Sequence, residues 1–218
     1  MARAFTRRPV KSRQTRWIRA LAAWLAARRV APNLISVLGV VAAALAAVCL
    51  VTVHAAPRAL QVVLVLAAGG FILLRLLANV LDGLVAVEGG LKSPTGDLFN
   101  EVPDRVSDVV IIATAGYAIP GVAWAVSLGW LAALLAVLTA YVRLLGGALG
   151  FEQSFAGPMA KAHRMALLFA GCAVSVVEIL VTGYRGWALT AALVVIAIGS
   201  FITAARRLLS IARQLASR

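Results

Sequence analysis

Long apolar runs, separated by short polar segments, dominate the chain. Six runs approach the length of about 20 residues that a helix needs to cross a bilayer. They cover residues 34–53, 60–77, 106–119, 123–144, 165–181 and 187–205. The third run is short unless its helix begins near Pro103. Since no internal repeat or low-complexity linker divides the chain, the pattern predicts an all-α integral membrane protein with six transmembrane helices in one domain, residues 1–218.

The segment before the first run has an amphipathic, helical pattern. Between residues 13 and 29, arginines lie beside or between apolar positions with three- and four-residue spacing, namely Trp17, Ile18, Leu21, Trp24 and Leu25. This pattern is typical of a basic helix that lies in the membrane interface, and it is equally typical of an orientation signal. We therefore divide the chain into a basic amphipathic segment, residues 1–33, and a six-helix core, residues 34–210.

Composition and charge support a membrane location. Apolar residues make up 62% of the chain, charged residues 13%, and the net charge is +13. Nine of the 21 lysines and arginines lie in the first 29 positions. Beside membrane spans, such a basic segment orients the protein or contacts anionic lipid, so we expect no nucleic-acid partner. The positive-inside rule predicts cytoplasmic termini, and the expected location is the bacterial inner (plasma) membrane.

Acidic residues are concentrated at one place in the chain. Six of the eight lie within residues 82–108, at Asp82, Glu88, Asp97, Glu101, Asp104 and Asp108. Carboxylates at a membrane boundary are costly unless they are paired, hydrated or bound to a metal. Grouped oxygen ligands of this kind suit hard cations such as Mg²⁺, Mn²⁺ or Ca²⁺.

Helical spacing places these side chains on two faces. Asn79 and Asp82 are three residues apart at the end of the second run. The third helix, extended toward its N-terminus, carries on one face Asn100, Glu101, Asp104 and Asp108. Two facing helices would then present converging oxygen ligands. Asn100 also has a structural interpretation, because asparagine is a favoured N-cap and Pro103 is tolerated in a first turn.

Two segments, NVLDGLVAV (residues 79–87) and GDLFNEVPD (residues 96–104), lie eight residues apart. Together they resemble the signature of the CDP-alcohol phosphotransferase family, D-x-x-D-G-x-x-A-R, then eight to eleven residues, then G-x-x-x-D-x-x-x-D. The spacing agrees throughout. The first and third aspartates of the signature are Asn79 and Asn100 here, and the arginine is Val87. The resemblance covers most of the chain and implies a membrane phosphotransferase.

The resemblance also implies roles for single residues. Family members hold two divalent cations, Mg²⁺ or Mn²⁺, with four aspartates, the last of which is also the base. Asp82 is then a metal ligand, and Asp104 is a ligand and the candidate base. Nucleotide binding is implied for the matching positions Asn79, Asp82, Gly83, Ala86 and Gly96.

The two asparagines change the expected metal site. Asn79 and Asn100 offer only neutral oxygens, which lowers the formal charge of the four signature positions from −4 to −2. Glu101 and Asp108 share a helix face with Asp104, so with Asp82 they would restore four carboxylates, with Asp108 as a further catalytic candidate. One bound metal, or a site without catalysis, are the alternatives.

Basic residues follow the fourth run and precede the fifth. Arg143, Lys161, His163 and Arg164 are candidates for binding an anionic acceptor or the donor phosphates. Cytoplasmic loops are rich in basic residues in any case. Arg75, within the second run and one turn before Asn79, needs a partner, for which Asp82 or a phosphate would serve.

The predicted function is transfer of a phosphatidyl, or another phospho-alcohol, group from a CDP-linked donor to a small hydroxylated acceptor, with release of CMP, in phospholipid biosynthesis. CDP-diacylglycerol is the expected donor, and the resemblance implies a homodimer. One alternative is a catalytically inactive relative that binds lipid or nucleotide. Another is an ion-coupled transporter, although the chain lacks the internal repeat that such proteins often contain.

Overall fold

The computed structural model describes residues 15–90 and 95–217, apart from the side chains of Glu88 and Asp97. The basic residues predicted to precede the amphipathic helix, residues 1–14, lie outside the described part. Within it the chain is helical, without strands, and the elements follow one another as α1 (Arg16–Ala27), α2 (Pro32–Thr52), the short 3-10 helix η2 (Val53–Ala55), α3 (Arg58–Glu88), α4 (Gly96–Tyr117), α5 (Ala125–Ala148), α6 (Lys161–Val181) and α7 (Trp187–Ala216).

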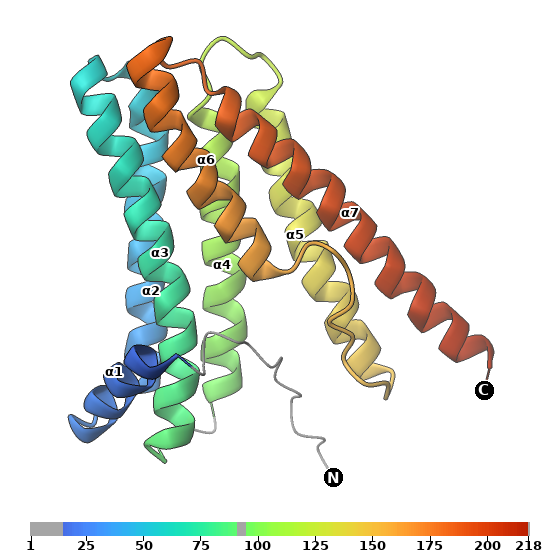
Figure 1. Ribbon diagram of the computed structural model, residues 1–218. Helices are drawn as coiled ribbons and strands as arrows, with labels where there is room; N and C mark the ends of the chain where they lie inside the picture. The colour runs from blue at the N-terminus through green and yellow to red at the C-terminus, as the bar shows by residue number, and fades with distance from the viewer. Residues whose placement is uncertain (1–14, 91–94, 218) are drawn as a thin grey trace.

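Six long helices run up and down through one bundle (Figure 1). Helix α2 packs against α3 and α4, while α5 contacts α4 and α7, and α6 contacts α3 and α7. The largest apolar core lies among these helices and contains Ile72, Ile111, Leu168 and Leu193. Helices α5 and α7 lean away from α2 to α4 at the end where α7 finishes (Figure 1).

Five helices in the described ranges are long and apolar enough to cross a membrane, namely α2, α3, α5, α6 and α7. Helix α4 has 22 residues and lies within the bundle, but charged residues occupy its first half. The chain is thus an all-helical membrane protein by its composition and helix lengths, and the sixth predicted span, α4, differs from the others in being polar where it begins.

Two helices extend beyond the apolar runs that predicted them. Helix α3 continues past residue 77 to Glu88, and α4 begins at Gly96, ten residues before its apolar run and beyond the predicted N-terminal extension that carries Asn100. An apolar run ends where polar side chains begin. The helix itself continues, because those polar side chains have partners on neighbouring helices. Helix α3 stops at Gly89, and Gly90 follows with a positive φ of 62°.

Helix α1 packs against one end of α3. Ile18 and Ala22 are buried in a small apolar cluster with Leu81 and Val85 of α3. Trp17 and Trp24 lie on the outer side and are more than half exposed. The predicted amphipathic helix therefore exists, and its location in the membrane interface stays a prediction.

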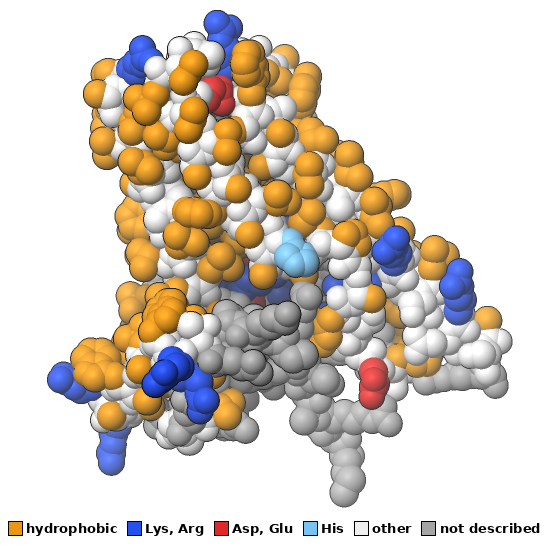
Figure 2. Space-filling view, viewed as in Figure 1, with side chains coloured by type: hydrophobic (Ala, Val, Ile, Leu, Met, Phe, Trp, Pro, Cys, Tyr) orange, Lys and Arg blue, Asp and Glu red, His pale blue; other side chains and the backbone are white. Residues whose placement is uncertain are grey.

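Figure 2 shows the side chains on one face of the molecule. Hydrophobic side chains cover most of the bundle, whereas lysines and arginines gather toward its ends. Helix α1 and the C-terminal end of α7 lie at the same end of the bundle (Figure 1), as an even number of crossings requires. The assignment of this end to the cytoplasm stays a prediction.

Candidate functional site

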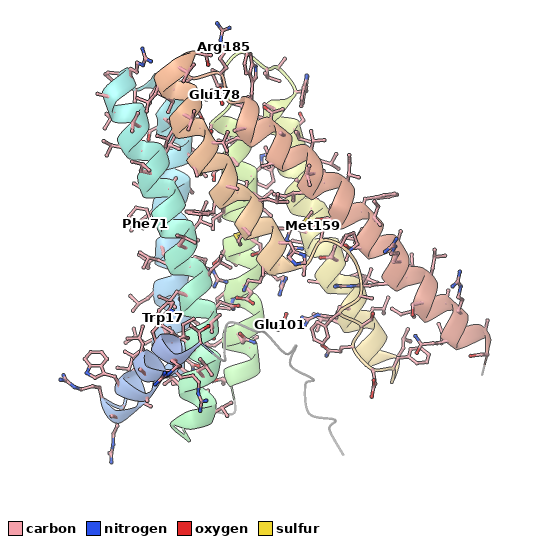
Figure 3. The ribbon with its side chains drawn as sticks, viewed as in Figure 1. Trp17, Phe71, Glu101, Met159, Glu178 and Arg185 are labelled. Carbon is pink, nitrogen blue, oxygen red and sulfur yellow. The ribbon has the colours of Figure 1, made fainter. Side chains whose placement is uncertain are left out.

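The candidate site lies between the helices toward the end of the bundle that α1 occupies. Glu101 marks this level of α4, whereas Glu178 and Arg185 lie at the opposite end (Figure 3). Helix α3 contributes one face, on which Arg75, Asn79, Asp82, Gly83 and Ala86 recur at three- and four-residue spacing. The extension of α3 past its apolar run is what carries this face into the site.

Three donors converge on one carboxylate oxygen. Oδ1 of Asp104 accepts hydrogen bonds from a guanidinium nitrogen of Arg75 at 2.5 Å and from Nδ2 of Asn79 at 2.7 Å. The ammonium nitrogen of Lys161, from α6, forms an ion pair with the same oxygen at 2.5 Å. The other oxygen, Oδ2, lies 3.9 Å from Arg105. Asp104 is therefore the point at which α3, α4 and α6 are joined.

Asp82 has a different environment. It is buried, and its Oδ2 accepts a hydrogen bond from Ser36 of α2 at 2.8 Å. Its Oδ1 is also buried and has no hydrogen-bond partner among the described residues. The charges of Asp104 and Lys161 are close enough to act on Asp82. Of the two signature aspartates, Asp82 is thus the one whose Oδ1 is available to contact a ligand.

Glu101 and Asp108 are each paired with an arginine from another helix. Glu101 Oε1 lies 2.6 Å from Arg143 of α5, and its Oε2 lies 3.2 Å from Arg105 one turn along α4. Asp108 Oδ2 lies 2.8 Å from Arg164 of α6, and both side chains of this pair are almost fully enclosed.

The predicted basic residues differ in how far ligands can reach them. Lys161 and Arg143 retain some exposure and face the acidic cluster, and the guanidinium of Arg143 also lies 5.5 Å from the ring of Phe155. Arg164 is enclosed, with Asp108, Thr139 and the carbonyl of Met159 as its partners. His163 is exposed, and its Nδ1 lies 2.8 Å from the carbonyl oxygen of Pro158.

Two structural expectations are corrected. Arg75 pairs with Asp104 and not with Asp82, because its side chain reaches across to α4. Asn100 is not an N-cap, since the cap of α4 is Thr95 and Asn100 lies in the second turn, partly buried. The nucleotide-binding and metal roles predicted for Asn79, Asn100, Gly83, Ala86 and Gly96 stay predictions.

Sequence reasoning missed several residues that support the site. Ser36 and Arg105 contact signature carboxylates, and the latter follows Glu101 by one helical turn, a spacing that could have revealed it. Arg207 is buried in α7 and donates to the carbonyls of Ala156 and Thr139. An arginine within an apolar helix is itself a signal, because it needs partners.

The geometry of the acidic residues differs from the two-cation site that the resemblance implies. The oxygens of Asp104 face basic groups and an amide, and Asn79 presents its amide nitrogen to Asp104. Among the residues that the structure describes, no three His, Cys, Asp or Glu side chains are grouped to share a metal ion. In this arrangement the described residues do not fit two divalent cations.

Neither a family model nor a curated protein sequence matches the chain. Its fold is similar to that of the Mycobacterium tuberculosis phosphatidylinositol phosphate synthase. The structure of that protein with CDP-DAG bound aligns with a TM-score of 0.71 at 19% identity, over 90% of this chain and 94% of that one. The complex with manganese and citrate gives 0.73 at 19% identity, over 89% and 88%.

The form of that synthase without ligand aligns equally well, with a TM-score of 0.70 at 19% identity over 88% of this chain and 94% of that one. At such identity the likeness shows the fold. The same fold is implied by the spacing of the two signature segments around Asp82 and Asp104. The chain therefore has the fold of the CDP-alcohol phosphotransferase family, with asparagine at two of the four signature aspartates.

Proposed function

We propose that the protein is a membrane phosphotransferase that moves a phosphatidyl, or another phospho-alcohol, group from a CDP-linked donor to a small hydroxylated acceptor and releases CMP. One observation carries this proposal: within a synthase-like fold, the basic side chains of Arg75 and Lys161 pair with Asp104, and the buried Asp82 lies in the same site near one end of an apolar bundle. The similar synthase has been crystallised with CDP-DAG bound. CDP-diacylglycerol is the donor that we favour, because its acyl chains would lie in the bilayer beside the helices.

The reaction needs charge compensation and a proton acceptor. The acceptor hydroxyl oxygen attacks the donor phosphorus that carries the lipid alcohol, and a new P–O bond forms. The P–O bond to the CMP phosphate breaks, and its electron pair leaves with CMP. Lys161 and Arg75 would offset the negative charge that grows on the pyrophosphate. The hydroxyl proton would pass to a carboxylate, for which Asp82 offers its free Oδ1.

Asp104 has a positioning role in this proposal. It was predicted as the base, but one of its oxygens already accepts two hydrogen bonds and an ion pair. A carboxylate so engaged is a weak proton acceptor, because its donors stabilise the charged form. Asp104 would instead hold Arg75 and Lys161 against the ligand.

The acceptor would bind beside the donor phosphates. Among the four basic candidates, Arg143 and Lys161 are placed best, because both form ion pairs with the acidic cluster. The side chain of Arg143 is partly exposed, whereas the ammonium nitrogen of Lys161 is buried against Asp104. His163 is proposed at the rim, where it is exposed. Arg164 would act indirectly, by holding Asp108 in the interior.

A second candidate is a catalytically inactive relative that binds a CDP-linked lipid or a nucleotide. The specific observation in its favour is the engagement of Asp104 by Arg75, Asn79 and Lys161. In either case we propose an integral protein of the bacterial inner membrane, with the site on the cytoplasmic side. A homodimer is proposed from the resemblance.

The experiment measures CMP release from CDP-diacylglycerol by the purified protein, with a panel of small alcohols, in Mg²⁺, in Mn²⁺ and in EDTA. Acceptor-dependent release that Asp82→Asn abolishes would support the transferase. Asp104→Asn should also lower CMP release, because the carboxylate that holds Lys161 and Arg75 in place is lost. Binding of CDP-diacylglycerol without CMP release from any alcohol would favour the inactive relative.

A further inference from the structure

Lysine and arginine side chains of the protein itself pair with the carboxylates of the candidate site. Five basic side chains form ion pairs with three of its four carboxylates, and the basic residues are Arg75, Arg105, Arg143, Lys161 and Arg164. With Asp82 included, four carboxylates face five basic groups, so the formal charge of these described side chains is +1. These nine side chains, taken together, oppose the entry of a divalent cation and attract a phosphate group.

Asn79 strengthens this arrangement. Because a carboxylate only accepts hydrogen bonds, the group of Asn79 that faces Asp104 Oδ1 at 2.7 Å is its amide nitrogen. An aspartate at position 79 would place a second negative charge beside Asp104 and would lower the formal charge of these side chains from +1 to zero. The asparagine avoids that charge and adds a hydrogen-bond donor.

Several polar atoms in the site are buried and lack a partner among the residues that the structure describes. Arg75 is 2% exposed, and its Nε has no hydrogen-bond acceptor within the described ranges. The ammonium of Lys161 makes its ion pair with Asp104 and has no further acceptor in this part of the chain. Asp82 is 6% exposed, and no described donor reaches its Oδ1. Buried polar groups are normally satisfied, so these atoms indicate a ligand with phosphate oxygens and a hydroxyl.

We propose that Lys161 and Arg75 occupy the role that divalent cations have in the signature-bearing family, so that the site binds the phosphates of its ligand without a metal. The identity of that ligand as a CDP-linked lipid rests on the proposed function. The absence of metal dependence rests on the side chains around Asp104.

The first test is metal binding by the protein alone. Electron paramagnetic resonance follows free Mn²⁺ as wild-type protein, or the double variant Asn79→Asp and Asn100→Asp, is added. We expect the wild type to leave the Mn²⁺ signal unchanged and the double variant to reduce it, because it restores four signature aspartates. Saturable Mn²⁺ binding by the wild type that Asp82→Asn abolishes would overturn the inference.

The second test is binding of CDP-diacylglycerol in nanodiscs, in EDTA and in MnCl₂. We expect affinities that agree within about twofold in the two buffers, and about tenfold weaker binding by Lys161→Met, since a charge-assisted contact is lost. Lys161→Arg should retain binding, and Arg206→Met, an exposed site on α7, is the matched control. Thermal unfolding checks that each variant is folded, and Lys161→Gln provides a second neutral variant.

Loss of CDP-diacylglycerol binding in EDTA would overturn the inference. Failure of the wild type to bind CDP-diacylglycerol in either buffer would instead refute the proposed function, and inorganic pyrophosphate in the same assay then decides the inference. Pyrophosphate binding in EDTA that Lys161→Met weakens would sustain a metal-free anion site. No pyrophosphate binding in EDTA would reject it.

Discussion

The guanidinium of Arg164 lies 2.8 Å from the carboxylate of Asp108 and joins α6 to α4 in the interior of the bundle. Each side chain in this pair is at most 3% exposed. Arg164 also contacts Thr139 of α5 and the carbonyl of Met159 before α6. The pair therefore fixes the position of Lys161, one turn earlier on α6, relative to Asp104, one turn earlier on α4.

Breaking this pair should be costly. Asp108→Ala leaves the buried guanidinium of Arg164 uncompensated, and we expect a loss of about 3–5 kcal/mol in unfolding free energy. The double variant Asp108→Leu and Arg164→Met should recover much of that loss, because both charges are removed together. Reversible unfolding in detergent measures both effects. Equal stability of Asp108→Ala and wild type would contradict the pairing.

Glu101→Gln tests whether Glu101 is a metal ligand, as the sequence predicts, or serves as an ion-pair partner of Arg143 and Arg105, as the structure shows. Glu101 pairs with Arg143 and Arg105 at a partly exposed position, so the neutral variant should lose less than about 1 kcal/mol of stability. It should also free two arginines and leave CDP-diacylglycerol binding unchanged or tighter. Binding of the lipid to liposome-reconstituted protein is the measurement. Loss of Mn²⁺-dependent binding in this variant would instead show that Glu101 is a ligand.

Ser36→Ala tests the support of Asp82. The variant removes the 2.8 Å hydrogen bond to Oδ2 of a buried carboxylate whose Oδ1 already has no partner among the described residues. We expect a loss of about 1.5–3 kcal/mol, as for hydrogen bonds to charged groups, and a lower rate of CMP release. Ser36→Thr keeps the hydroxyl and serves as the comparison. CMP release and thermal unfolding are measured on the same preparation. A loss of stability with unchanged CMP release would show that the role of Ser36 is structural only.

The location of α1 can be read from tryptophan fluorescence. Trp17 and Trp24 are exposed on the side of α1 away from α3, so an interfacial helix would place them at the headgroup level. In a variant with phenylalanine at positions 124, 130 and 187, lipids brominated near the headgroup should quench the fluorescence more strongly than lipids brominated near the chain end. Quenching by neither lipid would place α1 in water.

At the opposite end of the bundle, Glu178 caps α7. Its carboxylate accepts hydrogen bonds from the backbone N–H groups of Arg185, Trp187 and Ala188, at 2.7 to 3.4 Å. A negative charge at a helix N-terminus is favourable, so Glu178→Ala should cost about 0.5–2 kcal/mol. CMP release should be unaffected, because this end is remote from Glu101 and its neighbours. Thermal unfolding and the CMP assay on the same preparation check both expectations.

Much of the architecture follows from the sequence alone. An apolar run long enough to cross a bilayer has few alternatives to a membrane helix. The helical period of 3.6 residues then places Asn79 and Asp82 on one helix face, and Asn100 and Asp104 on another. These are local properties, because a side chain's direction depends on its position along its own helix. Helices α3 and α4 continue beyond their apolar runs; the extension of α4 to carry Asn100 was predicted, whereas its start at Gly96 and the end of α3 at Glu88 were not.

Only the tertiary structure decided which charges meet. Arg75 lies one turn from Asn79 and two turns from Asp82 on the same helix, yet its partner is Asp104 on α4. Lys161 reaches the same oxygen from α6. Such pairing depends on how the helices cross and at what depth each side chain lies, which hydropathy and periodicity do not specify. The sequence thus determined where the acidic residues gather. Helix packing determined that these carboxylates pair with basic side chains and do not face one another.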